Sequence, residues 1–344
     1  MTLPVEPGLQ DSGAGGRIEV RGVAGVGVDH AVVERLLHSS DVLERVKLQS
    51  LLAVATGARP AAVVAVPAEL PEGAQLSVQI EHQFHEHMQG RDQDPYDPLA
   101  RLLGRAVDRV RKKLLTEIKY KTEALNNIVV ENVKKARGYQ ALRKLVDELG
   151  LSLEIEVNRP TIQELYLITG AEQALEVREL GRLRRDLRYA SVRNPILHGP
   201  PHRRLFPEEC SPEFTRLSGR LLGYPDCCIE RYSFDQSSVT LSAQERASEQ
   251  IIQSRAAGEE PDAFAYFAHS FFPCEPRCPQ ASAAGHRLYQ ALEGLSARAA
   301  ETYRRQLDEN LELVVAYPEL IQEHMAHLKR QAMLAGGGKS GPLA

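Results

Sequence analysis

The sequence contains no tryptophan and only five cysteines, and all five cysteines lie between residues 210 and 278. It lacks any run of roughly 18 apolar residues, which a bilayer-spanning helix requires. The N-terminus also lacks a basic segment followed by an apolar one, as found in secretory signal peptides. We therefore expect a cytoplasmic protein with reduced cysteines, which then serve as metal ligands or nucleophiles rather than as disulfide partners.

A surplus of positive charge is also missing, since the formal net charge is −4. The chain as a whole therefore has no bulk attraction to nucleic acid. Apolar residues make up 43% and charged residues 26%, values typical of a folded protein in water. At 344 residues the chain is longer than one compact domain usually is, so we expect two domains.

The first half of the chain mixes short apolar segments with long helical periodicity. Apolar or alternating patterns predict strands at residues 18–21, 61–66, 76–80 and 151–157, and 3-and-4 spacing predicts helices at 30–55 and 99–149. The resulting order, strand, helix, two strands, helix and strand, permits a split βαβ, ferredoxin-like sheet.

After Pro160 the strand pattern largely stops, and helices separated by proline and glycine follow. We therefore expect an α+β protein with an α/β domain at residues 17–159 and an all-helical domain at 160–333 that contains the cysteines. Glycine-rich ends at 1–16 and 334–344 predict disordered tails. Helical spacing after residue 295, interrupted at Pro318, predicts a terminal helical hairpin.

The cysteines follow the pattern C-x16-C-C-x45-C-x3-C, formed by Cys210, Cys227, Cys228, Cys274 and Cys278. Pro225 favours a helix start just before the adjacent pair, and prolines around the second pair favour a stiff turn leading into another helix. A helix N-terminus stabilises a thiolate, and a rigid turn loses little entropy when it binds a metal. We therefore predict that the last four cysteines bind one metal centre, with Cys210 as an accessory ligand.

Four soft thiolates suit zinc or an iron–sulfur cluster. Structural zinc sites usually use C-x2-C pairs, whereas this chain has C-C and C-x3-C. Adjacent ligands are easier to accommodate on the separated irons of a cluster than on one tetrahedral ion. We therefore favour an iron–sulfur cluster such as 4Fe–4S over zinc, and a redox dithiol at either pair stays open.

Other polar residues are candidates for chemistry near the cysteines. His269 and Asp226 lie close in sequence to the two cysteine pairs and are candidate acid–base groups. Arginines are concentrated at residues 178–204, and among them Arg184 and Arg185 are candidate contacts for an anionic small molecule or RNA. The same arginines can instead pair with acids of the first domain.

Two motifs, Gly-Tyr-Pro-Asp-Cys-Cys ending at Cys228 and Phe-Phe-Pro-Cys-Glu-Pro-Arg-Cys ending at Cys278, resemble an uncharacterised prokaryotic family known as domain of unknown function 483. The resemblance covers about residues 161–292 and implies no established activity. A more distant likeness, to the cysteine domain of heterodisulfide-reductase-type subunits, implies an unusual cluster or zinc. Here Ile229 follows the pair where that pattern has glycine, and the last spacing is longer by one residue.

These observations favour a cysteine-ligated metal protein with a redox or Lewis-acid role on an anionic small molecule or RNA. The alternatives are a nucleic-acid-binding or scaffold protein with a structural zinc site, and a thiol-redox protein. The sequence does not decide whether the protein is an enzyme.

Overall fold

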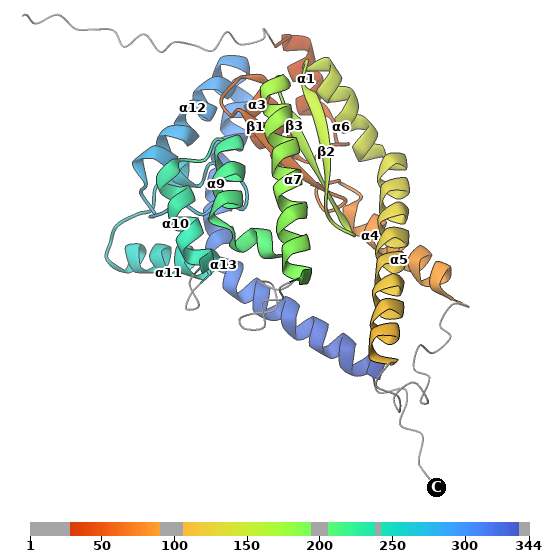
Figure 1. Cartoon of the computed structure of the whole chain (residues 1–344). Helices are drawn as coiled ribbons and strands as arrows, with labels where there is room; N and C mark the ends of the chain where they lie inside the picture. The colour runs from red at the N-terminus through yellow and green to blue at the C-terminus, as the bar shows by residue number, and fades with distance from the viewer. Residues whose placement is uncertain (1–27, 90–105, 194–205, 238–241, 337–344) are drawn as a thin grey trace, which may run out of the picture.

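The computed structural model describes residues 28–89, 106–193, 206–237 and 242–336. The fold is α+β, with a small antiparallel sheet between groups of helices (Figure 1). The predicted tail at 1–16, the predicted strand at 18–21 and residues 337–344 of the predicted tail at 334–344 lie outside the described residues. Residues 334–336 belong to a helix, so the predicted tail is wrong at these three positions. In the described parts of the chain, no helix is both long and apolar enough to cross a bilayer.

The elements before the last strand of the sheet are α1 (His30–His38), α2 (Glu44–Val46), the π-helical turn η1 (Lys47–Leu52), α3 (Ala53–Ala55), β1 (Ala61–Val66), α4 (Gly73–Met88), α5 (Ala106–Lys135), α6 (Arg137–Glu148) and β2 (Ser152–Arg159). The others are β3 (Ile162–Ile168), α7 (Ala171–Arg193), η3 (Pro207–Cys210), α9 (Pro212–Leu221), α10 (Asp226–Ser237), α11 (Ala243–Ala256), η4 (Ala263–Tyr266), α12 (Pro279–Leu295) and α13 (Ala297–Gly336).

The sheet has the order β1-β3-β2, and both outer strands run antiparallel to β3. Ile168 of the central strand lies opposite Ala61 on one side and Ser152 on the other. Sequence analysis missed β3, because Pro160 was interpreted as the end of a domain. Arg159 pairs with Ile162, so Pro160 lies in the tight turn of the β2–β3 hairpin, where proline is common.

The position of β3 corrects the predicted domain division. A boundary at Pro160 would cut the sheet between its central strand and β2, so the helical part of the chain does not begin there. One buried core also contains Leu52 and Val64 together with Tyr303 and Leu307. The part of the chain that the structure describes therefore has one continuous core across the predicted boundary.

The predicted strand at 76–80 is wrong, because these residues lie within α4. Leu76 and Ile80 are buried while Val78 is 69% exposed. Apolar residues four positions apart fit one face of a helix as well as alternate positions of a strand, and here the helix forms. Among the described residues the sheet has three strands, and the ferredoxin-like order is not found.

Two predicted helices are interrupted, and two are joined. The helix expected at 30–55 breaks at Ser39, whose side chain accepts a hydrogen bond from the amide of Asp41 in a turn. The helix expected at 99–149 breaks at Ala136, which has extended backbone angles. Pro318 does not end a helix, since α13 continues through it, and the predicted terminal hairpin is one helix.

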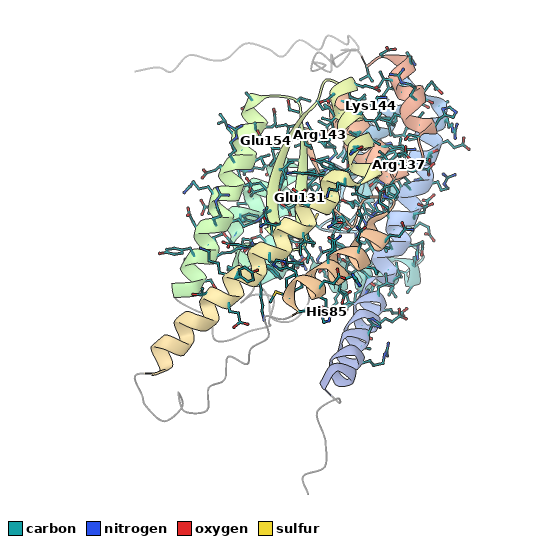
Figure 2. All side chains as sticks on the ribbon, turned by 90° about the vertical axis from the view of Figure 1, so that its right-hand side faces the viewer. His85, Glu131, Arg137, Arg143, Lys144 and Glu154 are labelled. Carbon is teal, nitrogen blue, oxygen red and sulfur yellow. The ribbon has the colours of Figure 1, made fainter. Side chains whose placement is uncertain are left out.

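Helices cover both faces of the sheet. Val64 and Leu165 point into the main core, and Tyr166 and Ile168 pack on the opposite face against α7 and α9. The outer surface of α5 and α6, next to β2, presents charged side chains of both signs, including Glu131 and Lys144 (Figure 2). This layering places α9 against α7, and α10, which carries the first cysteine pair, packs against α9 (Figure 1).

Candidate metal centre

The first cysteine pair lies in the first turn of α10, as predicted. Helix α9 ends at Gly223, whose φ of +72° is the left-handed conformation that glycine adopts without strain. Pro225 directly precedes α10, and its carbonyl accepts hydrogen bonds from the amides of Cys228 (2.9 Å) and Ile229 (3.0 Å). Both Cys227 and Cys228 therefore sit at the positive end of the helix dipole.

The second pair lies in a turn that leads into α12, also as predicted. The amide of Cys278 donates to the carbonyl of Glu275 over 3.2 Å, and Pro279 is the first residue of the helix. The carbonyl of Pro276 accepts a hydrogen bond from the amide of Asp262 over 3.0 Å, which anchors the turn to the rest of the fold. Cys278 is the residue that caps α12.

The fold brings the sulfur atoms of the two pairs together. The Sγ atoms of Cys227, Cys228, Cys274 and Cys278 all lie within 4.8 Å of one another, so the group can hold a metal ion. The Sγ–Sγ distances are 3.8 Å for Cys227–Cys228, 3.6 Å for Cys227–Cys278 and 3.7 Å for Cys228–Cys278. Cys228 and Cys278 are buried, while Cys227 and Cys274 are partly exposed.

The surroundings supply partial positive charge to these sulfurs. The backbone amide of Cys274 donates to Cys228 Sγ over 3.4 Å. Burial raises the pKa of the Cys228 thiol well above its ordinary value and raises that of Cys274 to about 12. Burial also opposes ionisation of Cys278, but the amide of Ala281 and the neighbouring thiols lower the pKa of Cys278 below its usual value. A bound cation is what would ionise all four thiols.

A buried ion pair connects the helix that carries the first cysteine pair to the turn that carries the second, and the sequence did not predict it. Arg246 on α11 donates through Nε to Oδ2 of Asp235 on α10 (2.6 Å) and through Nη1 to the carbonyl of Pro273 (3.0 Å). Its Nη2 is buried with no protein partner. No local pattern marks Arg246, because its partners lie 11 and 27 residues away in the sequence.

Cys210 does not join the four-sulfur group. It ends the short turn η3, one residue before Ser211 caps α9, and the structure gives it no place as an accessory ligand in that group.

The two candidate acid–base residues lie apart from each other. Asp226 is an exposed residue at the start of α10, and its carboxylate accepts a hydrogen bond from Arg220 over 3.2 Å. His269 is partly buried in the wall of a polar cavity of about 390 Å³, where burial and the charge of Arg45 lower its pKa. Neither residue belongs to the metal-binding group, and catalysis by either stays a prediction.

The arginines on α7 pair mainly with acids of the sheet. Arg184 is buried and donates to Glu164 over 2.7 Å, and Arg185, which is exposed, donates to Glu156 over 3.5 Å. This pairing is the alternative that the sequence left open, and it gives Arg184 a structural role. Residues 194–205 of the arginine-rich segment lie outside the described residues, so binding of RNA or another anion stays a prediction.

A second cavity, of about 210 Å³, adjoins the metal centre and was not expected from the sequence. Tyr224 and Cys228 of the first motif contribute to its wall, as do Phe271 and Phe272 just before Cys274. Tyr224 and Ser270 also line the polar cavity around His269, so the two cavities are neighbours.

Comparison of the chain with protein-family models, with curated proteins and with solved structures finds no match. The resemblance to domain of unknown function 483 therefore stays a hypothesis, and the function has to be argued from the site itself.

Proposed function

We propose that Cys227, Cys228, Cys274 and Cys278 bind a single zinc ion with a structural role. The observation that carries this proposal is the separation of the sulfurs. Zinc–thiolate bonds of about 2.3 Å in a tetrahedron require sulfurs about 3.8 Å apart. The three distances among Cys227, Cys228 and Cys278, which are 3.6, 3.7 and 3.8 Å, agree with that value, and the sulfur of Cys274 lies within 4.8 Å of these three.

The same distances disfavour an iron–sulfur cluster, which we expected from the sequence. A 4Fe–4S cluster places its own iron and sulfide atoms between the thiolates, which then stand roughly 6 Å apart. The largest separation here is below that, since all four sulfurs lie within 4.8 Å. The argument from adjacent cysteines also weakens, because the Cys227 and Cys228 sulfurs are already spaced as two corners of one tetrahedron.

A structural role follows from the ligand count. Four protein ligands complete a tetrahedral zinc site and leave no open position for substrate or water. A zinc ion that acts as a Lewis acid requires such an open position, so this site would be structural. Zinc with four thiolates carries a net charge of about −2, and the N-termini of α10 and α12, which hold three of the four cysteines, stabilise that charge. The ion would therefore crosslink α10 to α12 and lower the conformational entropy of the chain between them in the unfolded state.

Anaerobic purification followed by metal and sulfide analysis tests the proposal. We expect about one zinc per chain without acid-labile sulfide, and a tetrahedral thiolate spectrum after cobalt substitution. If the analysis instead finds iron with stoichiometric sulfide, the zinc proposal is wrong and the site holds an iron–sulfur cluster. No metal, together with free titration of all five thiols, would leave the thiol-redox alternative.

Single substitutions separate the ligands from the remaining cysteine. Replacement of Cys228 or Cys278 by serine is expected to lower zinc content to less than one tenth, because a buried ligand is lost. Cys210→Ser is the matched control and is expected to keep full zinc content, because Cys210 lies outside the group. Loss of zinc from the control as well would contradict the assignment.

A further inference from the structure

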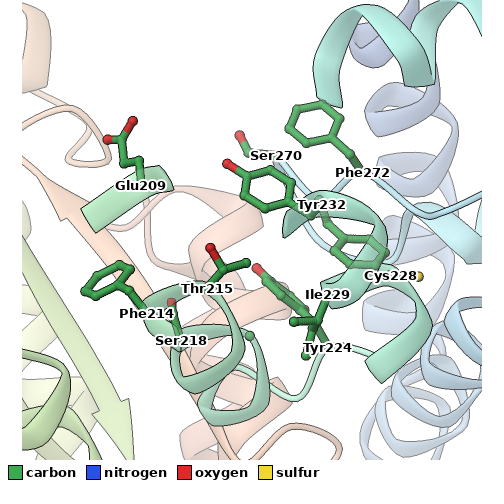
Figure 3. A pocket seen from close by; sticks show the side chains of 12 residues that line it. Glu209, Phe214, Thr215, Ser218, Tyr224, Cys228, Ile229, Tyr232, Ser270 and Phe272 are labelled. Carbon is green, nitrogen blue, oxygen red and sulfur yellow. The ribbon is translucent and has the colours of Figure 1, made fainter. Parts of the chain in front are cut away.

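The cavity of about 210 Å³ beside the metal centre is lined by aromatic rings and hydroxyl groups. Figure 3 shows Thr215 and Ser218 of α9 on one side of the space and Tyr232, Ser270 and Phe272 on the other. The hydroxyl-bearing residues come from three separate segments, so the tertiary structure, and no single motif, builds the cavity.

Two features connect the cavity to the metal centre. Tyr224 lies three residues before Cys227, and Phe272 lies two residues before Cys274, so the segments that hold the ligands also form the wall. Ser270 has a φ of +59°, a strained left-handed conformation that residues with a side chain rarely adopt. Such strain persists only where neighbouring contacts impose it, and here it fixes a hydroxyl at the junction of the two cavities.

The charge of the wall restricts the ligand. As far as the described residues go, the wall contains no lysine, arginine or histidine, so it offers no cation to a phosphate or carboxylate. Its acidic residue is Glu209, whose Oε1 accepts a hydrogen bond from Arg159 over 2.9 Å. A negatively charged ligand would therefore lose its hydration without gaining a partner, and would face a carboxylate.

The size and the rings define the shape of the ligand. An apolar cavity of about 150 Å³ already accommodates benzene, so this cavity has room for one or two fused rings. Tyr224 and Phe271 have their ring centroids 4.8 Å apart at a tilt of 40°, and further rings at Phe214, Tyr232 and Phe272 complete an aromatic wall. Aromatic walls favour planar ring systems, and the hydroxyls would orient polar groups on the ring edge.

We infer that this cavity binds a small planar heteroaromatic compound that carries no negative charge, such as a base without phosphate. The cavity shares Cys228 with the metal centre, and the ion supports the cavity by holding Tyr224 and Phe272 in place. The inference stands on the described side chains and does not depend on which metal occupies the centre.

A pair of nearly isosteric probes tests the inference with the full-length, metal-loaded protein. Indole-3-carboxamide is uncharged, whereas indole-3-carboxylate has the same rings and a negative charge. Because the protein contains no tryptophan, the fluorescence of the indole probes is observed without a background from protein indole. We expect saturable binding of the carboxamide and at least tenfold weaker binding of the carboxylate. Equal affinities, or no binding of the carboxamide, would overturn the inference.

Two variants on α9 place the binding in the cavity. Thr215→Phe fills the space and is expected to weaken carboxamide binding at least tenfold. Glu213→Phe, on an exposed position of the same helix outside the wall, is the control and is expected to leave binding unchanged. Ser218→Leu repeats the test if Thr215→Phe does not fold. Binding that survives in every folded filling variant, or is lost equally in the control, would overturn the inference.

Zinc content is measured on the same preparations. The failure of the zinc proposal can therefore be distinguished from the failure of the cavity proposal. Cavity binding by a protein that holds a cluster or no ion would contradict the zinc proposal alone. Full zinc content with no carboxamide binding would contradict the cavity alone.

Discussion

Arg246 and Asp235 form an ion pair of 2.6 Å in which the two side chains are only 4% and 5% exposed. The pair joins α11 to α10, and the same guanidinium reaches the carbonyl of Pro273 beside Cys274. Arg231 also donates to Asp235, over 3.1 Å, from one turn earlier in α10. Arg246 thus connects the helix that carries the first cysteine pair to the loop that carries the second. It does so through a carboxylate and a backbone carbonyl, and through no cysteine sulfur.

Replacement of Arg246 by methionine is expected to lower zinc affinity about 10- to 100-fold, the usual effect of removing a group that orients metal ligands. It should also reduce the free energy of unfolding by roughly 3 kcal/mol, because Asp235 loses its buried partner. Zinc competition with a chromogenic chelator measures the affinity. Arg255→Met is the control on the same helix, since Arg255 pairs with Glu312 at the surface. Equal affinities of the two variants would show that the ion pair does not support the metal centre.

Two glycines of α12 provide a matched pair of substitutions. A Cβ at Gly285 would lie 2.2 Å from the carbonyl oxygen of Phe264, whereas a Cβ at Gly294 would meet nothing within 4 Å. Gly285→Ala is therefore expected to destabilise the protein by roughly 2–4 kcal/mol, because α12 must move away from η4. Gly294→Ala should raise the free energy of unfolding by about 0.5 kcal/mol through helix propensity. Denaturant midpoints measure both effects, and similar midpoints would disprove close packing at Gly285.

Alkaline pH should destabilise the fold through buried tyrosines. Burial raises the pKa of Tyr303 above its ordinary value, and burial also raises the pKa of Tyr232 to about 12. The folded state therefore favours the protonated phenols. Their contribution to stability is complete below pH about 10 and is lost as the pH rises through the higher folded values.

Tyr303→Phe tests this dependence. It removes the hydrogen bond to the carbonyl of Phe267 (2.9 Å), so stability at neutral pH should fall by about 1 kcal/mol. The fall in stability above pH 10 should become shallower. Unfolding curves at several pH values measure the slope, and an unchanged slope would remove Tyr303 as a contributor.

Separation of the chain at Pro160 should prevent folding of the C-terminal part. A fragment of residues 160–344 contains β3 but neither of its partner strands, and it lacks half of the shared core. We expect no cooperative thermal transition from this fragment, even with zinc, while the full chain unfolds cooperatively. Calorimetry provides the measurement. A sharp transition from the isolated fragment would restore the division into two domains at Pro160.

The sequence by itself determined the local features of the metal centre. Pro225 and Pro279 mark helix starts, because proline restricts φ to a value that fits the first turn of a helix. Gly223 marks a helix end, because glycine adopts a positive φ without strain. The positions of the two cysteine pairs at those starts followed from the same signals. The apolar segment at 61–66 likewise predicted β1 correctly.

Only the tertiary structure decided the rest, because the deciding contacts join residues distant in sequence. Leu76 and Ile80 fit a strand or a helix, and packing selected α4. Pro160 fits a linker or a hairpin turn, and the pairing of β3 on both edges selected the turn. The capacity of the cysteines to hold a metal ion also depends on distances between sulfurs 50 and 51 residues apart. Spacing along the chain does not fix such distances, since they result from how helices pack around one shared core.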